Sequence, residues 1–259
     1  MVYSRDRLHS DLEDRVYGEM IDREASWNKV NTLGRTRADL ERALEIVTVL
    51  LRSQKKGSAN VAPAVLDFGC GWGTLLKLLS ASSVRTIGFD VTPWKVASAR
   101  AAGLNVLDRW ELVEQAAREN GGFDFAVSTA VLEHVADPAD VLAKIARVLK
   151  PGATVYLTCI IPDVARAGGW ARLRKRVAKN EKFSKEVNPL EHLNYFTPAS
   201  LAALMRQKGF FPVRPPGFWW AGSFSTRNLV RKLLKRWGPL GWNHVFVTDF
   251  WEYRPTPSS

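Results

Sequence analysis

Residues 65–73, VLDFGCGWG, join an apolar run that ends in an acid to three glycines at alternate positions. This pattern predicts a buried strand that leads into a tight, ligand-binding turn. The glycines Gly69, Gly71 and Gly73 let the backbone adopt positive φ angles and approach a ligand closely, which a Cβ atom would prevent. Asp67, at the carboxyl end of the strand, is placed to accept a hydrogen bond from an amine or hydroxyl of that ligand.

A second apolar segment also ends in an acid. Residues 84–90, VRTIGFD, end at Asp90, the position at which doubly wound folds bind ribose hydroxyls with a carboxylate. Two parallel strands that each end in an acid predict one shared pocket. A dinucleotide dehydrogenase is the main alternative, but its glycines follow a G-x-G-x-x-G spacing, whereas these follow G-x-G-x-G.

Strands and helices alternate along the chain after residue 60. Apolar patterns predict further strands at 123–128, 153–159, 211–213 and 244–251, with a turn at 149–152 before the second of them. Helices are expected at 36–53, 74–82, 93–102, 110–120, 138–149 and 198–209. This alternation is typical of an α/β fold whose parallel sheet is covered on both faces.

In the order and spacing of these motifs, residues 62–216 resemble the class I S-adenosylmethionine-dependent methyltransferases. Within them the chain is similar to the small-molecule branch of ubiquinone-biosynthesis and sugar methyltransferases. The resemblance implies a Rossmann-like, doubly wound α/β sheet of seven strands, mostly parallel with an antiparallel last strand. It also implies S-adenosylmethionine as the cofactor, with its methionine end on the glycine turn and its ribose on the acid of the second strand.

The resemblance implies a set of candidate cofactor-binding residues in the turns after successive strands. They are Asp67, Gly69, Cys70, Gly71, Gly73, Asp90, Val91, Asp108, Trp110 and Thr129. For the adenine, Asp108 would accept from the exocyclic amine and Trp110 would offer an aromatic face. The alternative is that both residues cap and pack the following helix.

The first 60 residues differ in pattern and predict an N-terminal helical cap on a methyltransferase domain of residues 61–259. Thr36 and Asp39 fit a capping box at the start of the helix over 36–53. The expected apolar face consists of Leu40, Ala43, Leu44, Val47, Leu50 and Leu51. Packing on the sheet is the simpler role, and the resemblance implies a cover over the cofactor, with Tyr3, Tyr17 and Trp27 as candidate lid residues.

Two insertions, at about 161–190 and 217–242, interrupt the alternation and are expected to be helical. Both are rich in Lys and Arg, and the second combines a basic face with an apolar one. Such a helix suits a membrane surface, although its apolar side could equally pack on the domain. The formal net charge of +11 favours an acidic or phosphorylated small-molecule acceptor.

Nucleic acid is disfavoured as the acceptor. Methylases that attack base nitrogens carry an N/D-P-P-Y/F segment after the fourth strand, and residues 128–131 here read STAV. The pair Thr158-Cys159 imitates a motif of RNA cytosine-C5 methylases, but their companion Pro-Cys element is missing. Cys159 is therefore interpreted as a core thiol.

His134 and His192 are the candidate catalytic bases, because both are expected at the carboxyl edge of the sheet and imidazole titrates near neutral pH. Glu133 precedes His134 in the region where the resemblance implies methyl transfer. The alternative for Glu133 and His134 is a pair that caps a helix and fixes the loop, and the alternative for His192 is a structural role. An E-x-x-E-H metal-binding pattern is incomplete, because its first position is Ala130, and no metal is expected.

We expect an S-adenosylmethionine-dependent enzyme that O-methylates a hydroxylated metabolite such as a sugar, a glycan-lipid or an isoprenoid intermediate. N- or C-methylation, RNA methylation and a non-catalytic cofactor-binding scaffold are the alternatives. No stretch approaches the roughly 18 apolar residues that a spanning helix needs, and residues 1–7 are charged rather than signal-like. A cytoplasmic location is expected, peripheral to a membrane if the basic insertions bind lipid.

Overall fold

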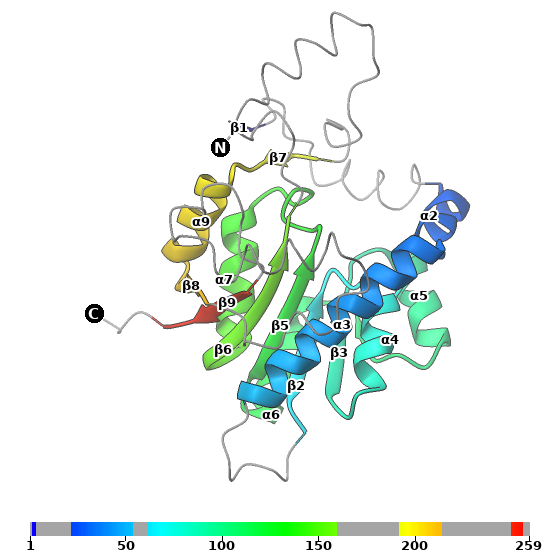
Figure 1. Ribbon diagram of the computed structural model, residues 1–259, viewed down its shortest axis with the longest axis horizontal. Helices are drawn as coiled ribbons and strands as arrows, with labels where there is room; N and C mark the ends of the chain where they lie inside the picture. Colours follow the sequence, from blue (N-terminus) through cyan, green and yellow to red (C-terminus); the bar gives the residue numbers. More distant parts are fainter. Residues whose placement is uncertain (1, 4–21, 54–61, 160–191, 214–249, 256–259) are drawn as a thin grey trace, which may run out of the picture.

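The computed structural model describes residues 2–3, 22–53, 62–159, 192–213 and 250–255 of the chain. Its centre is a seven-stranded sheet of order β4-β3-β2-β5-β6-β9-β8 (Figure 1). The strands are β2 (Ala64–Phe68), β3 (Arg85–Phe89), β4 (Val106–Leu107), β5 (Phe123–Thr129), β6 (Leu149–Thr158), β8 (Phe210–Pro212) and β9 (Phe250–Tyr253). Within this sheet only β9 runs antiparallel to its neighbours, which confirms the expected mostly parallel sheet with an antiparallel last strand.

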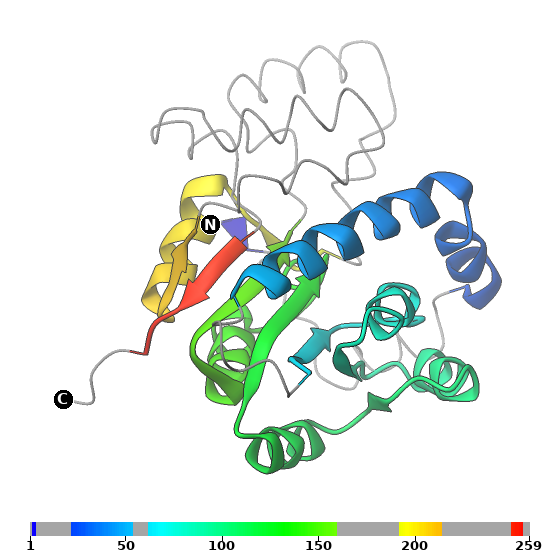
Figure 2. The same ribbon diagram turned by 60° about the horizontal axis from the view of Figure 1, so that its bottom comes forward.

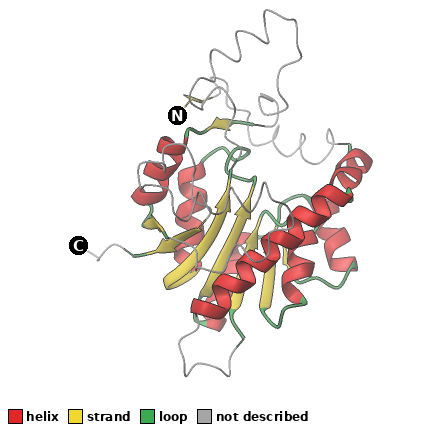
Figure 3. Ribbon diagram, in the orientation of Figure 1, coloured by secondary structure: helices red, strands yellow, loops and turns green. Residues whose placement is uncertain are grey.

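Helices cover both faces of the sheet (Figures 2 and 3). They are α2 (Arg23–Val30), α3 (Leu33–Ser53), α4 (Thr74–Ser80), α5 (Pro93–Ala101), α6 (Trp110–Asn120), α7 (Pro138–Val148) and α9 (Pro198–Gln207). One hydrophobic cluster joins α3 and α4 to one face of β2 and β5, and another joins α6, α7 and α9 to the opposite face. Every residue of β2 is consequently buried, as expected for a central strand of a parallel sheet.

Capping residues begin the helices close to the positions that the sequence predicts. Asp137 precedes α7, and its carboxylate accepts from the backbone amides of Ala139 and Asp140. Thr197 and Ser200 form a reciprocal capping box at the start of α9. These local contacts need no distant partner, which is why the helix starts are readable from sequence.

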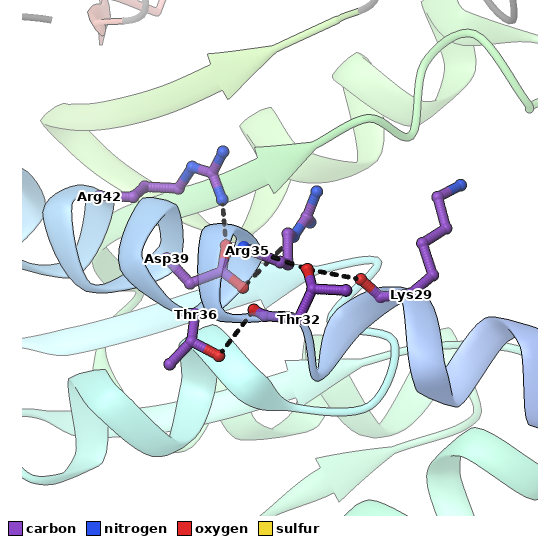
Figure 4. A network of polar contacts seen from close by, with 6 residues as sticks. All are labelled: Lys29, Thr32, Arg35, Thr36, Asp39 and Arg42. Carbon is purple, nitrogen blue, oxygen red and sulfur yellow. Dashed lines mark hydrogen bonds and ion pairs between the residues drawn. The ribbon is translucent and has the colours of Figure 1, made fainter.

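The predicted capping box at the start of α3 is wrong. The helix begins one turn earlier, where the Thr32 hydroxyl accepts from the Arg35 amide at 3.3 Å. Thr36 lies inside the helix and donates to the Thr32 carbonyl, while Asp39 forms an ion pair with Arg42 at 2.6 Å (Figure 4). Asp39 is therefore a buried ion-pair partner rather than a cap.

The predicted apolar face of α3 is correct only in part. Leu40 and Leu44 are 39% and 40% exposed, whereas Ala43, Ile46 and Leu50 enter the core. The helix is rotated relative to the predicted stripe, so that Asp39 shares the buried face with Ala43, Ile46 and Leu50. The side chain of Leu51 lies outside the described residues.

Strand β6 begins earlier than expected and absorbs the predicted turn at 149–152. Leu149 pairs with Phe123, and the register then shifts before Thr154 pairs with Phe125. Gly152 accommodates this irregularity with a φ of +79°. The final strand, expected at 244–251, is described from Phe250, and residues 244–249 lie outside the described part.

A second, two-stranded sheet was not predicted. The segment β1 (Val2–Tyr3) pairs antiparallel with β7 (Asn194–Tyr195), which lies near the carboxyl ends of β5 and β6 (Figure 1). Both basic insertions and Tyr17 lie outside the described residues. Among the helices that the structure describes, none has the length and apolar character to cross a membrane.

Candidate cofactor and acceptor site

The turn after β2 has the backbone conformation that its glycines predict. Gly69, Gly71 and Gly73 adopt φ angles of +76°, +56° and +75°, which residues other than glycine rarely adopt. A Cβ atom on Gly69 would lie 2.4 Å from a methyl carbon of Val131. A Cβ atom on Gly71 would meet no atom within 4 Å, so the turn leaves open space at its centre.

Asp90, directly after β3, ties this turn to the next one. Its Oδ2 accepts from the Gly71 amide at 2.8 Å, and its Oδ1 accepts from the Thr92 amide at 2.9 Å. The side chain is 8% exposed. The second-strand acid therefore holds the glycine turn in place through both oxygens of its carboxylate.

Asp67 is the buried acid of the site. Its pKa is raised to about 7, chiefly by burial and to a smaller extent by the carboxylates of Asp90 and Asp39, while Arg42 of α3 acts in the opposite direction. A carboxyl group in this state gains from a nearby ammonium group, which would favour its charged form. The methionine end of S-adenosylmethionine carries such a group, so the residues around the turn fit this cofactor.

Three tryptophans gather beside the glycine turn. The Trp72 indole N–H donates to the hydroxyl of Ser26 in α2 at 3.2 Å. Its ring centroid lies 4.8 Å from that of Trp27 and 5.0 Å from that of Trp94. Of the candidate lid residues, Trp27 thus contacts the cofactor turn, while the Tyr3 backbone pairs with Asn194 at the other sheet.

Two of the candidate adenine-binding residues have partners within the fold. Asp108 forms an ion pair with Arg100 at 3.2 Å. Trp110 packs its ring against Phe68 and Phe89, and its indole N–H donates to Glu114 in the same helix at 2.9 Å. These contacts match the packing alternative, and the adenine contacts stay predictions.

The remaining candidates around the turn differ in exposure. Val91 is 65% exposed, next to Asp90. Cys70 is half-buried and packs where Gly88 leaves room, and burial raises the pKa of its thiol. Thr129, at the end of β5, is also half-buried. Their roles toward a cofactor stay predictions.

The loop after β5, residues 130–135, connects the cofactor turn to the candidate bases, and we call it the acceptor loop. Ala130 opens it with a φ of +55°, and Val131 packs on Gly69. Asn194 holds the loop from β7, since its side-chain amide donates to the carbonyls of Leu132 at 3.1 Å and Val135 at 2.6 Å. Its backbone amide also donates to the carbonyl of the intervening Glu133, at 3.0 Å.

The fold brings the two candidate bases together. The imidazole centroids of His134 and His192 lie 4.9 Å apart in an edge-to-face arrangement, and His192 is 5% exposed. The Tyr195 ring lies 6.2 Å from that of His192. The sequence analysis placed both histidines at this edge but did not identify Asn194 and Tyr195, although they lie only two and three residues after His192.

Glu133, in the acceptor loop, is fully buried, and its side chain forms a hydrogen bond with the Cys159 thiol. Burial raises the pKa of the Cys159 thiol, and the negative charge of Glu133 raises it to a smaller extent. The thiol is therefore held in its unreactive protonated form. Within the described residues, no cluster of three or more His, Cys, Asp or Glu side chains has the arrangement of a metal site.

Residues 35–214 match a protein family described as a methyltransferase domain. The ubiquinone biosynthesis O-methyltransferase of Hahella chejuensis is 37% identical over 101 residues, which cover 37% of this chain and 42% of that protein. The enzyme of the same name from Xanthomonas axonopodis pv. citri is 30% identical over 164 residues, 59% of this chain and 65% of that one. The chain therefore matches about two fifths to two thirds of the length of these two relatives.

Among solved structures, the plantazolicin methyltransferase BpumL in complex with SAH superposes with a TM-score of 0.59. The alignment covers 94% of each chain at 14% identity, so it supports the fold alone. The family match covers the glycine turn, Asp90 and the acceptor loop. On this match and on the observed sheet, the chain belongs to the class I S-adenosylmethionine-dependent methyltransferases.

Proposed function

We propose that the protein transfers the methyl group of S-adenosylmethionine to a hydroxyl oxygen of a small molecule, with His134 or His192 accepting the proton. One observation carries this proposal: His134 belongs to the acceptor loop, which packs on the cofactor turn through Val131 and Gly69, and the His192 ring centroid lies 4.9 Å from that of His134. A proton acceptor on a loop that contacts the cofactor turn suits methyl transfer to an atom that must lose a proton.

The protein's own part in such a reaction is positioning and proton removal. The bound cofactor supplies a methyl group already activated by its sulfonium. Asp90 and the glycine turn would orient the cofactor, and Asn194 would hold the acceptor loop so that an acceptor lies in line with the methyl group. An uncharged imidazole can accept the acceptor's proton.

Two further observations support an oxygen of a small molecule as the acceptor. The relatives from Hahella chejuensis and Xanthomonas axonopodis pv. citri are named as O-methyltransferases. The segment 128–131, STAV, lacks the N/D-P-P-Y/F pattern of base-nitrogen methylases. The net charge of +11 supports an acidic or phosphorylated acceptor, for which the basic insertions would supply contacts in the cytoplasm or at a membrane surface.

The test has two stages. Calorimetric titration with S-adenosylmethionine, SAH and NAD establishes the cofactor, and binding of NAD alone would contradict the family function. The protein is then incubated with S-adenosylmethionine and a panel of phenols, sugars, lipid-linked glycans and amines, and product masses and methylated atoms are determined. Methylation of an oxygen supports the proposal, whereas transfer only to nitrogen or carbon, or to no compound, would contradict it.

A further inference from the structure

The Tyr195 hydroxyl is a polar group near the histidine pair that the proposed reaction does not yet use. Its oxygen atom is buried, and none of the described residues forms a hydrogen bond with it. The side chain as a whole is half-buried. Buried phenol hydroxyls in proteins normally have a hydrogen-bond partner. A bound ligand could supply the partner that this hydroxyl lacks among the described residues.

The backbone around Tyr195 is held on several sides. Its strand, β7, pairs with β1, in which Val2 is the register partner of Tyr195. The preceding residue, Asn194, makes three hydrogen bonds to the acceptor loop. The next helix is anchored by the Thr197 capping box. The backbone of Tyr195 is therefore held in a fixed place beside the acceptor loop.

Tyr195 continues a row of polar aromatic rings along this edge. The His134 ring lies 4.9 Å from the His192 ring, which lies 6.2 Å from the Tyr195 ring. The two imidazoles can accept a proton, whereas the phenol hydroxyl can donate a hydrogen bond. Burial raises the pKa of Tyr195 above its ordinary value, so the phenol keeps its proton at neutral pH and is not itself a base.

We propose that the Tyr195 hydroxyl binds the methyl acceptor by donating a hydrogen bond to one of its oxygen atoms, beside the histidine pair. This inference rests on the proposed function. In the reaction, an oxygen lone pair forms the new bond to the methyl carbon, the carbon–sulfur bond breaks with its electron pair going to sulfur, and the proton passes to an imidazole. Tyr195 neither gains nor loses a proton and acts by holding the acceptor.

The first test measures binding of a chromogenic phenol. The full-length protein, saturated with SAH, is titrated with 4-nitrophenol, and the absorbance change of the probe is followed. Tyr195→Phe removes the hydroxyl and keeps the ring, so the Kd of the probe should rise about fivefold, as expected for one neutral hydrogen bond. No binding to the unaltered protein, or an equal Kd in the variant, would overturn the proposal.

The matched control is Tyr253→Phe. Tyr253 is also half-buried, but it lies on β9 near the amino end of β6, opposite the acceptor loop, and packs against Phe210. This variant should bind 4-nitrophenol as the unaltered protein does. Both variants should bind SAH with unchanged affinity, and a loss in Tyr195→Phe alone would mean that Tyr195 supports the cofactor turn rather than the acceptor.

A second test separates this inference from the proposed function. With an acceptor from the panel, Tyr195→Phe should raise KM about fivefold and change kcat little, because the lost contact holds the acceptor. Unchanged KM and kcat would overturn the role of Tyr195 while O-methylation stands. If no acceptor is methylated but the phenol Kd still responds to Tyr195→Phe, the binding site stands and the proposed reaction falls.

Discussion

The carboxylate of Asp90 accepts a hydrogen bond from the backbone amide of Gly71, with 2.8 Å between Oδ2 and the nitrogen. Its second oxygen accepts from the Thr92 amide. The acid that the family resemblance assigns to the ribose thus also braces the glycine turn. One side chain therefore ties the glycine turn after β2 to the segment after β3.

Replacing Asp90 by Asn should weaken S-adenosylmethionine binding about tenfold or more. The amide cannot serve both backbone donors and the ribose as a carboxylate does, and a hydrogen bond to a charged group contributes about 1.5–3 kcal/mol. Calorimetry measures the change. Asp124→Asn is the control, because Asp124 pairs with Lys150 at the opposite end of the sheet, so its affinity for the cofactor should stay unchanged.

Gly69→Ala should destabilise the fold more than Gly71→Ala. Both positions require a positive φ, which costs an L-residue about 1–2 kcal/mol. Only at Gly69 would the new methyl group also meet Val131, at 2.4 Å, whereas Gly71 has open space. Chemical denaturation measures both free energies of unfolding.

The double variant Gly69→Ala/Val131→Ala isolates the contact between the turn and the acceptor loop. It should recover part of the stability lost in Gly69→Ala, because the clashing methyl group is gone. Strictly additive losses would contradict a direct contact between these two residues.

Cofactor affinity should rise with pH through about 7, the pKa of Asp67 in the ligand-free protein. Below that pH the carboxyl is protonated, and a bound ammonium group must displace the proton. Calorimetry in buffers of different ionisation enthalpy, at about pH 6, should detect proton release on binding. Asp67→Asn should bind more weakly and without this proton release.

The raised pKa of Asp67 also makes the free energy of unfolding depend on pH. Because the folded-state pKa of Asp67 lies above the unfolded value of 3.8, the folded state binds more protons between these values. The contribution of Asp67 to the free energy of unfolding should therefore decrease from about pH 4 to pH 7 and then level off. A pH series of denaturation curves for the unaltered protein and Asp67→Asn should show this difference. Parallel curves would contradict it.

Asn194→Ala should impair methyl transfer without affecting cofactor binding. The substitution leaves the carbonyls of Leu132 and Val135 without their side-chain donor, at a cost of about 1–3 kcal/mol each. Turnover should fall because the acceptor loop loses its brace. Asn120→Ala, which removes a side-chain bond to the Ala116 carbonyl in α6, is the control that should retain turnover.

Replacing the catalytic base by Ala should lower kcat and leave S-adenosylmethionine affinity intact. In the unaltered protein the rate should decrease in acid, because a protonated base cannot accept the acceptor's proton. The variant of His134 or His192 that loses this pH dependence identifies the base. If both variants keep the profile and the rate, proton transfer to either histidine is ruled out.

Much of the fold and of the cofactor turn is readable from sequence because it depends on neighbours in the chain. Positive φ at Gly69, Gly71 and Gly73 follows from residue type, and Asp137 and Thr197 cap their helices through amides a few residues away. The placement of Asp67 and Asp90 at one edge follows from parallel strands. The expected seven-stranded sheet was therefore correct.

Contacts between distant segments were decided only by the tertiary structure. The rotation of α3, which brings Arg42 toward Asp67 and leaves Leu40 exposed, results from packing against the sheet rather than from its own periodicity. The pairing of β1 with β7 likewise joins segments that lie far apart in sequence.

The sequence by itself determined the family, the glycine turn and the edge of the sheet at which His134 and His192 lie. Only the tertiary structure decided that these rings approach to 4.9 Å, that Asn194 braces the acceptor loop, and that the Tyr195 ring lies 6.2 Å from that of His192 with its hydroxyl buried. The physical reason is that local conformation depends on residue type and near neighbours. A site assembled from the glycine turn, the acceptor loop and residues 192–195 depends on how the whole core packs.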